Sequence, residues 1–142
     1  MFLSRQFSFE AGHRLSKNKS LCSNIHGHNY KLIVTLKSGF KNSEDMIVDF
    51  SEIKKIIKKS IIDLLDHSLI LNQTDKKLID FCKKNKYKTF ITFGDPTAES
   101  LAELIYYEVN KIFPYGNNIS IHSVTLYETD DCWVTYSGVF CG

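Results

Sequence analysis

This sequence has no long apolar run and almost no excess charge. No stretch approaches the roughly 20 apolar residues that are needed to cross a bilayer, and no cleavable apolar signal opens the chain. The formal net charge is only +2 and the lysines are dispersed, so no feature indicates binding to nucleic acid. We therefore expect a cytoplasmic enzyme or binding domain, with neither a membrane nor a nucleic acid as its partner.

The sequence also has no paired cysteines. Its four cysteines, Cys22, Cys82, Cys132 and Cys141, form no CxxC motif. With 142 residues and 43% hydrophobic content, the chain predicts a single globular domain over 1–142 that buries its own core without disulfides. We expect reduced thiols, most of which pack as small hydrophobic side chains. Cys22 is the exception to examine, because only three residues separate it from a histidine pair.

That histidine pair opens a strongly alternating stretch. Ring-bearing or aliphatic residues occupy the even positions: His28, Tyr30, Leu32, Val34 and Leu36. The period of two predicts a strand, so His26 and His28 leave the backbone on the same side. Two neutral imidazoles at this spacing can converge on one metal ion. The alternative is a pair of ordinary histidines near a strand end.

A third histidine, His13, follows an earlier alternating stretch. Residues 1–11 carry apolar side chains mainly at odd positions, which predicts a half-buried strand, and His13 keeps that parity. A lone histidine in this setting is commonly a core residue with its hydrogen bonds satisfied. Catalytic zinc, however, typically has three protein ligands and one open position. His13 is therefore the candidate third ligand beside His26 and His28.

The rest of the chain predicts an α+β domain. We expect a short strand at 46–49, a helix at 49–65 and a short helix at 75–85. An edge strand at 87–93, a second long helix at 95–113 and a terminal hairpin at 119–140 follow. Asp49 and Asp95 are the expected N-caps, with Pro96 at the first helical position. We expect an antiparallel four-stranded sheet with two helices on one face. Its open edges invite closure by other subunits.

Two further places carry candidate chemistry. Asp66 precedes His67 where the first long helix ends, and an acid beside a histidine stabilises the imidazolium, which suits proton delivery. Adjacent side chains on a helix point apart, so this pair need not hydrogen-bond. Glu128 ends an apolar strand face, where a ligand with two parallel N–H donors would satisfy it; an exposed acid at a turn is the alternative. Thr97 and Glu99 open the second long helix, where an acid usually complements the helix dipole.

Six short motifs follow one another in a specific order. They are Phe9-Glu10-Ala11-Gly12-His13-Arg14-Leu15, Cys22-x3-His26-Gly27-His28-Asn29-Tyr30, Val48-Asp49-Phe50, Leu65-Asp66-His67, Pro96-Thr97-Ala98-Glu99 and Glu128-Thr129. Together they resemble the 6-pyruvoyl-tetrahydropterin synthase and 6-carboxytetrahydropterin synthase family over nearly the full chain. The resemblance implies the tunnelling fold, in which subunits close their sheets into a barrel. It also implies active sites at subunit boundaries and a homohexamer as the usual assembly.

The resemblance assigns a metal and a base. By their positions in the motifs, His13, His26 and His28 correspond to the zinc ligands, and Cys22 corresponds to the thiol base. A dication nearby favours the thiolate, which is the reactive form of cysteine. The implied substrate is 7,8-dihydroneopterin triphosphate.

The resemblance also assigns substrate contacts. Asp66 and His67 match the family's Asp and His pair, which reaches a neighbouring subunit's site in the fold. Glu128 matches the acid that anchors the pterin, and Thr97 and Glu99 match the segment that lines its pocket. A bidentate contact from Glu128 to the 2-amino and N3–H edge would reject molecules that lack this edge.

The spacing of the thiol and the histidines bears on the product. Three residues between Cys22 and His26 are similar to the 6-carboxytetrahydropterin synthases of the queuosine pathway, which also release acetaldehyde, whereas pyruvoyl enzymes usually have five. We expect the 6-carboxy product, with the 6-pyruvoyl product of triphosphate elimination as the alternative. Gly12 stands where alanine is common, and 73–93 is longer than in compact members. A different alternative is a structural zinc held by Cys22 and the three histidines in a binding module without chemistry.

Overall fold

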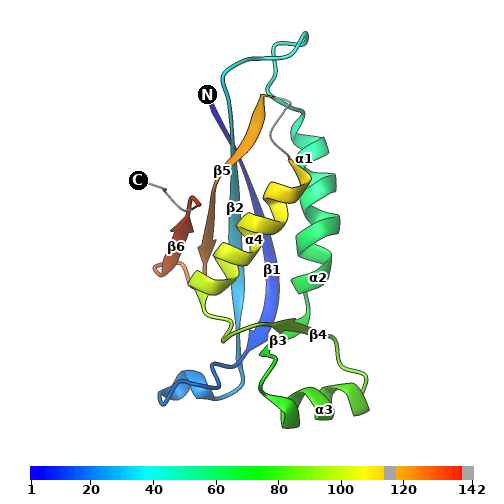
Figure 1. The fold of residues 1–142 in the computed structure, drawn as a ribbon, viewed down its shortest axis with the longest axis vertical. Coiled ribbons are helices and arrows are strands. Elements are labelled where there is room, and N and C mark those ends of the chain that lie inside the picture. Colours follow the sequence, from blue (N-terminus) through cyan, green and yellow to red (C-terminus); the bar gives the residue numbers. More distant parts are fainter. Residues whose placement is uncertain (114–117, 139–142) are drawn as a thin grey trace.

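The computed structural model describes residues 1–113 and 118–138, which form one curved sheet with helices packed on it (Figure 1). The six strands lie in the order β4-β3-β1-β2-β5-β6. Their bounds are β1 Phe2–His13, β2 His26–Ser38, β3 Ser68–Asn72, β4 Thr89–Thr92, β5 Ile119–Tyr127 and β6 Trp133–Tyr136. The expected α+β class is confirmed, but the expected four-stranded antiparallel sheet is wrong. The sheet is mixed, because β3 runs parallel to both β1 and β4.

Two strand assignments explain the difference. Residues 46–49 form no strand: the Asn42 backbone N–H donates to the Met46 carbonyl at 2.6 Å, which closes a turn, and Asp49 caps a helix. The sequence analysis missed β3, although its five residues are mostly buried. A short buried run directly after a helix shows no alternation, so periodicity does not separate it from the helix end. The expected edge strand near 87–93 is β4.

The first long helix covers the core face of the sheet. It consists of α1 (Phe50–Ile57), a single π-helical turn (Lys58–Ile62) and α2 (Asp63–Leu65), which follow one another without a break. Asp49 is its N-cap, as expected, and accepts a hydrogen bond from the Ser51 backbone N–H at 2.6 Å. Its buried stripe includes Ile53 and Ile57.

The second long helix, α4 (Ala98–Ile112), lies beside the first on the same face (Figure 1). Its N-cap is Thr97, whose hydroxyl accepts from the Ser100 backbone N–H at 3.2 Å. The expected cap at Asp95 and first helical position at Pro96 are therefore wrong. The Asp95 carboxylate instead accepts hydrogen bonds from Ser16 and Lys17 in the β1–β2 connection and from Asn72 in β3.

The core lies between the sheet and these two helices. Tyr30, Leu32 and Val34 of β2 are fully buried against Leu101 and Ile105 of α4 and their neighbours. Burial of each aliphatic side chain of this size contributes about 1.5–3 kcal/mol. The register of β1 and β2, and with it every side chain on this face, is thereby fixed.

The remaining helix, α3 (Lys76–Lys84), lies apart from this layer, beside β3 and β4 (Figure 1). It confirms the short helix expected at 75–85. No helix in the described part of the chain is long and apolar enough to cross a membrane. Cys22, Cys82 and Cys132 are free thiols, as expected, and Cys141 lies outside the described residues, as do 139–140 of the expected last hairpin.

Candidate metal centre and substrate pocket

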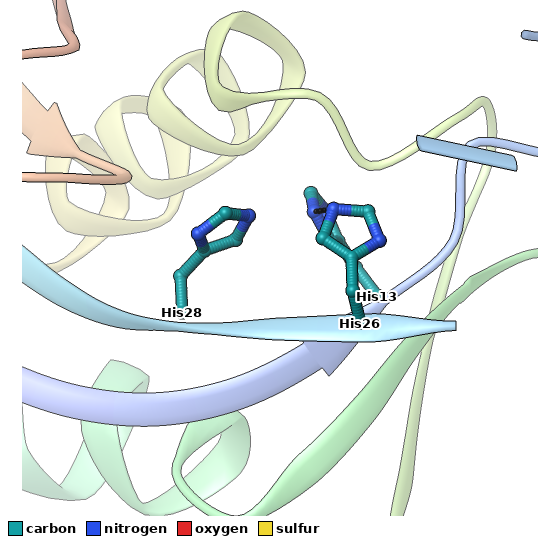
Figure 2. Close-up of side chains that lie close together, drawn as sticks. All are labelled: His13, His26 and His28. Carbon is teal, nitrogen blue, oxygen red and sulfur yellow. Dashed lines mark hydrogen bonds between the residues drawn. The ribbon is translucent and has the colours of Figure 1, made fainter. Parts of the chain in front are cut away.

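The three histidines meet where β1 ends and β2 begins. In the antiparallel register His13 pairs with His26, and Ala11 pairs with His28, so all three imidazoles stand on the core face of the sheet (Figure 2). One nitrogen of each ring lies within 4.8 Å of the others. Within residues 1–113 and 118–138, the group of side chains that could hold a metal ion consists of these three histidines. Cys22 is not part of it. The structure thus brings the predicted ligand set together.

Two backbone carbonyls fix the orientation of the rings. His13 Nδ1 lies 2.8 Å from the Pro96 oxygen, and His26 Nδ1 lies 2.8 Å from the Asn24 oxygen. Since a carbonyl oxygen only accepts, each Nδ1 donates, and the neutral ring keeps its lone pair on Nε2. Those two Nε2 atoms lie 3.0 Å apart. Lone pairs at this distance repel unless a cation lies between them, so the donor set fits a metal ion.

His13 is held in the form that a metal requires. It is 1% exposed. Burial lowers its pKa, and this outweighs the opposite effects of the Pro96 hydrogen bond and the Glu128 charge. Tyr30 packs beside it, with its hydroxyl 3.3 Å from His13 Nδ1, and burial raises the Tyr30 pKa. The site therefore contains a neutral imidazole and a protonated phenol.

Glu128 lies at the edge of the histidine cluster. Its Oε1 is 3.6 Å from His13 Nε2 and 3.9 Å from His28 Nε2. The side chain follows β5, and the Glu128 backbone N–H donates to the Cys132 carbonyl at 3.0 Å in the turn to β6. It is 26% exposed. The turn therefore directs this carboxylate toward the histidine cluster rather than into solvent.

The predicted substrate contacts line one cavity beside the cluster. Glu128, Thr97 and Glu99 surround a space of about 340 Å³ together with Leu15 and Trp133. Thr97 and Glu99 reach it from the start of α4, and Glu128 reaches it from the end of β5. Three segments that are distant in sequence therefore meet at one hollow, and Glu128 connects that hollow to the imidazoles.

Cys22 lies on a short 3₁₀ turn, Leu21–Ser23, in the connection between β1 and β2. Its backbone N–H donates to the Ser20 hydroxyl at 3.2 Å, and the residue is half-buried. The sulfur is near the cluster in sequence, but it does not complete the group of converging donors. A four-ligand structural zinc that includes Cys22 finds no support in this arrangement.

Asp66 and His67 hydrogen-bond to each other, although residues adjacent on a helix do not. Asp66 is already extended and His67 has a positive φ of 58°, which turns the two side chains together at 2.9 Å. Asp66 also accepts from the Glu10 backbone N–H at 2.9 Å, which is the largest of the effects that lower its pKa. His67 is 75% exposed and faces a second hollow, which is also lined by Gly27, His28 and Asn29. Within one chain this pair does not join the histidine cluster.

Comparisons with known proteins agree with this arrangement. The family model described as 6-pyruvoyl tetrahydropterin synthase matches residues 2–139. The chain belongs to this family. It is 36% identical over 136 residues to a Rickettsia felis protein named 6-carboxy-5,6,7,8-tetrahydropterin synthase, covering 92% of this chain and 95% of that protein. A Haemophilus influenzae protein of the same name is 35% identical, with 94% and 96% covered.

More distant relatives carry the other family name. The human 6-pyruvoyl tetrahydrobiopterin synthase is 31% identical over 150 residues, with 96% of this chain and 90% of that protein covered. The solved structure of Caenorhabditis elegans 6-pyruvoyl tetrahydropterin synthase superposes with a TM-score of 0.71 at 24% identity, covering 98% and 96% of the two chains. This likeness shows that the fold is that of the family.

In this member of the family, several site residues escaped the sequence analysis. Asp95 accepts hydrogen bonds from Ser16 and Lys17 in the loop that carries Cys22, and Asn72 donates to it from β3. The Pro96 carbonyl holds His13. Asp95 has the sequence signature of a helix cap, and no local pattern distinguishes a capping aspartate from one that bridges distant segments. A carbonyl contact has no sequence signal.

Proposed function

We propose that the protein is a zinc-dependent lyase that converts 7,8-dihydroneopterin triphosphate to 6-carboxy-5,6,7,8-tetrahydropterin, with release of acetaldehyde and triphosphate, in queuosine biosynthesis. The observation that carries this proposal is the cluster of His13, His26 and His28 beside the cavity at Glu128. Relatives at 36% and 35% identity bear the name of this activity.

Zinc is the metal that the donor set favours. Three imidazoles with one position left open are typical of catalytic zinc sites. Bound there, zinc would act as a Lewis acid on hydroxyl groups of the substrate side chain and make the neighbouring C–H protons more acidic. The carbonyls of Pro96 and Asn24 orient His13 and His26 for this role.

Glu128 anchors the pterin ring. Its carboxylate lies within the cavity and accepts from the 2-amino and N3–H groups, two parallel donors that match its two oxygens. Thr97 and Glu99 line the same cavity from α4. The ring would thereby be held beside the histidine cluster, with its side chain within reach of a metal bound there.

Two groups move protons in this proposal. Cys22 removes a proton from the substrate side chain. His67 moves protons on the opposite face, and the ionised Asp66 holds the His67 ring through the bond at 2.9 Å. Because His67 is 75% exposed in one chain, it is free to enter the site of a neighbouring subunit. A homohexamer that joins sheet edges into a barrel supplies this neighbour, and β4 and β6 are the edges available.

The runner-up function is 6-pyruvoyl-tetrahydropterin synthase, which eliminates triphosphate without loss of acetaldehyde. The human relative at 31% identity bears the corresponding name. The three-residue spacing between Cys22 and His26 favours the 6-carboxy product instead.

Mass spectrometry of the products tests the proposal. The zinc-loaded protein is incubated with 7,8-dihydroneopterin triphosphate, and we expect the mass of 6-carboxytetrahydropterin together with one acetaldehyde per turnover. The mass of 6-pyruvoyltetrahydropterin without acetaldehyde would establish the runner-up. Unchanged substrate with zinc-loaded protein would refute both. His28→Ala serves as the inactive control.

A further inference from the structure

The segment 14–24, here named the Cys22 loop, has no core of its own. None of its residues is buried, and Leu21 is 85% exposed. A loop without buried apolar side chains does not take its position from packing, so hydrogen bonds must hold it. The location of the Cys22 thiol therefore depends on the contacts that this loop makes with the rest of the chain.

The Cys22 loop is closed internally. The Leu15 backbone N–H donates to the Cys22 carbonyl at 3.0 Å, and the Ser23 backbone N–H donates to the Ser20 carbonyl at 3.0 Å. The Leu15–Cys22 hydrogen bond thus joins the two sides of the loop. Fixing the residues next to Leu15 also fixes the turn that carries Cys22.

Asp95 fixes those residues. Its Oδ1 accepts from the Ser16 hydroxyl at 2.8 Å, and its Oδ2 accepts from the Lys17 backbone N–H at 2.8 Å. Asn72, which is 1% exposed at the end of β3, donates to Oδ1 at 2.7 Å. Burial raises the pKa of Asp95, but the hydrogen bonds from Asn72, Lys17 and Ser16 outweigh it and lower the pKa. The carboxylate is therefore ionised, the form in which both oxygens accept.

The residue next to Asp95 holds the metal centre. The carbonyl of Pro96 accepts from His13 Nδ1 at 2.8 Å. The dipeptide Asp95-Pro96 therefore contacts both parts of the site. The Asp95 side chain binds the Cys22 loop, and the Pro96 carbonyl binds the proposed metal ligand His13. We propose that Asp95 is the positioning residue that sets the Cys22 thiol relative to the metal centre. This inference rests on the function proposed above for Cys22.

A second carboxylate holds the far end of the same loop. Arg14 donates from Nε to the Ser23 carbonyl at 2.7 Å and from Nη1 to Asp75 Oδ2 at 2.7 Å. Asp75 stands immediately before α3 and its side chain is 9% exposed. With this end still anchored, loss of the Asp95 contacts displaces the loop at Ser16 and Lys17 without releasing it.

The test compares Asp95→Asn with a matched control. The amide cannot accept at both of its terminal atoms, and of its three partners only the Ser16 hydroxyl can turn to accept instead. Either the Lys17 or the Asn72 contact is therefore lost. We expect kcat to fall about 10- to 100-fold, as for other displacements of a reacting group. Zinc content stays at the wild-type level, and amide hydrogen exchange accelerates in 14–24. Asp49→Asn is the control, because Asp49 also accepts from a backbone N–H but caps α1. Since Asn caps a helix about as well as Asp, Tm, kcat and loop exchange should all stay close to wild type in this control.

Ser16→Ala provides a second route to the answer, because kcat, loop exchange and Cys22 alkylation of this single variant can be measured whether or not Asp95→Asn folds. It removes one donor to Asp95, so it causes a smaller loss of kcat, and its effect shrinks in the Asp95→Asn background because both act through one contact. Mass-spectrometric alkylation rates of Cys22 are measured alongside, and we expect them to change in both variants.

The outcomes separate this inference from the proposed function. Wild-type exchange in 14–24 and a wild-type Cys22 alkylation rate in both variants would overturn the role of Asp95, and so would an equal loss of kcat in Asp49→Asn. Exchange and alkylation need no substrate. If the wild-type protein fails to turn over 7,8-dihydroneopterin triphosphate, the proposed function fails, while these two measurements still decide whether Asp95 positions the thiol.

Discussion

Substitution of Gly27, which separates the two histidines of β2, is the most stringent test of whether the histidine cluster binds zinc. Gly27 pairs with Gly12 across the β1–β2 register, one position from the His13–His26 pair. A Cβ at Gly27 would lie 3.0 Å from the Ala11 carbonyl oxygen, whereas ordinary contact begins at 3.4 Å. The obstacle is backbone near the end of β1, so no side-chain rotation relieves it. Gly27→Ala must therefore separate the two strands by about 0.4 Å at the ligands.

This displacement has a calculable cost. Gly27 is exposed, so the cost comes from the forced backbone shift, about 1–3 kcal/mol, which lowers the Tm of a domain of this size by roughly 3–10 °C. Zinc–nitrogen distances vary by only about 0.2 Å around 2.0–2.1 Å. A shift of about 0.4 Å between the strands of His13 and His26 exceeds this tolerance. We expect zinc affinity to fall roughly 10- to 100-fold, as for loss of a contact that orients a ligand.

Two matched glycines complete the experiment. At Gly12 the nearest atom is Leu69 Cδ1 at 3.1 Å, the end of a flexible side chain, and at Gly39 nothing lies within 4 Å. Zinc affinity is measured by competition with a chromophoric chelator, and Tm is measured on the metal-free variants. Gly12→Ala and Gly39→Ala should stay close to wild type. Wild-type zinc affinity in Gly27→Ala, or equal losses in all three variants, would refute the close approach of the strands as the basis of the site.

Four further predictions address the remaining residues. Cys22→Ala should retain zinc and the oligomer but lose turnover, which zinc analysis and a product assay check; normal turnover would remove the thiol from the mechanism. His28→Ala should bind zinc at least 10-fold more weakly in the chelator assay, and unchanged binding would show a wrong ligand set. Glu128→Gln should weaken pterin binding about 10-fold or more in calorimetry while it spares zinc; equal affinity would exclude the anchor. Because the pKa of Asp95 is lowered from 3.8, its ionised form stabilises the fold above that value. The Tm difference between wild type and Asp95→Asn should therefore shrink as pH falls below about 4, and a gap that is constant from pH 6 to 3 would contradict this.

The sequence predicted that the three histidines lie together because strand parity is a local property. His26 and His28 share a face through alternation, and His13 keeps the parity of its own strand. Once burial of the apolar face fixes the register of β1 and β2, the three rings must lie on the same side. To bring the three rings together, β1 and β2 need only pair with each other. A connection of 12 residues, 14–25, joins these two strands directly.

Features that depend on distant segments were not predictable in this way. The parallel pairing of β3 with β1 is invisible to periodicity, since all but one of the five residues of β3 are buried. The hydrogen bond between Asp66 and His67 depends on the positive φ of His67, which no local pattern indicated. Asp95 was expected to cap a helix, but tertiary donors outcompete the helix for its carboxylate. At β3, His67 and Asp95, tertiary contacts override the local sequence preference.

The segment 95–99 connects all the parts of the site. Asp95 holds the Cys22 loop, the Pro96 carbonyl orients His13, and Thr97 and Glu99 line the cavity that Glu128 closes. Capping of α4 at Thr97 rather than at Asp95 makes this possible, because the two preceding residues remain outside the helix with their polar groups free for other partners. Had the helix begun at Pro96, the Asp95 carboxylate would serve the helix amides, and the loop and the metal ligand would each need a separate support. The position of this single N-cap therefore determines whether the Cys22 loop, the histidine cluster and the cavity share one support.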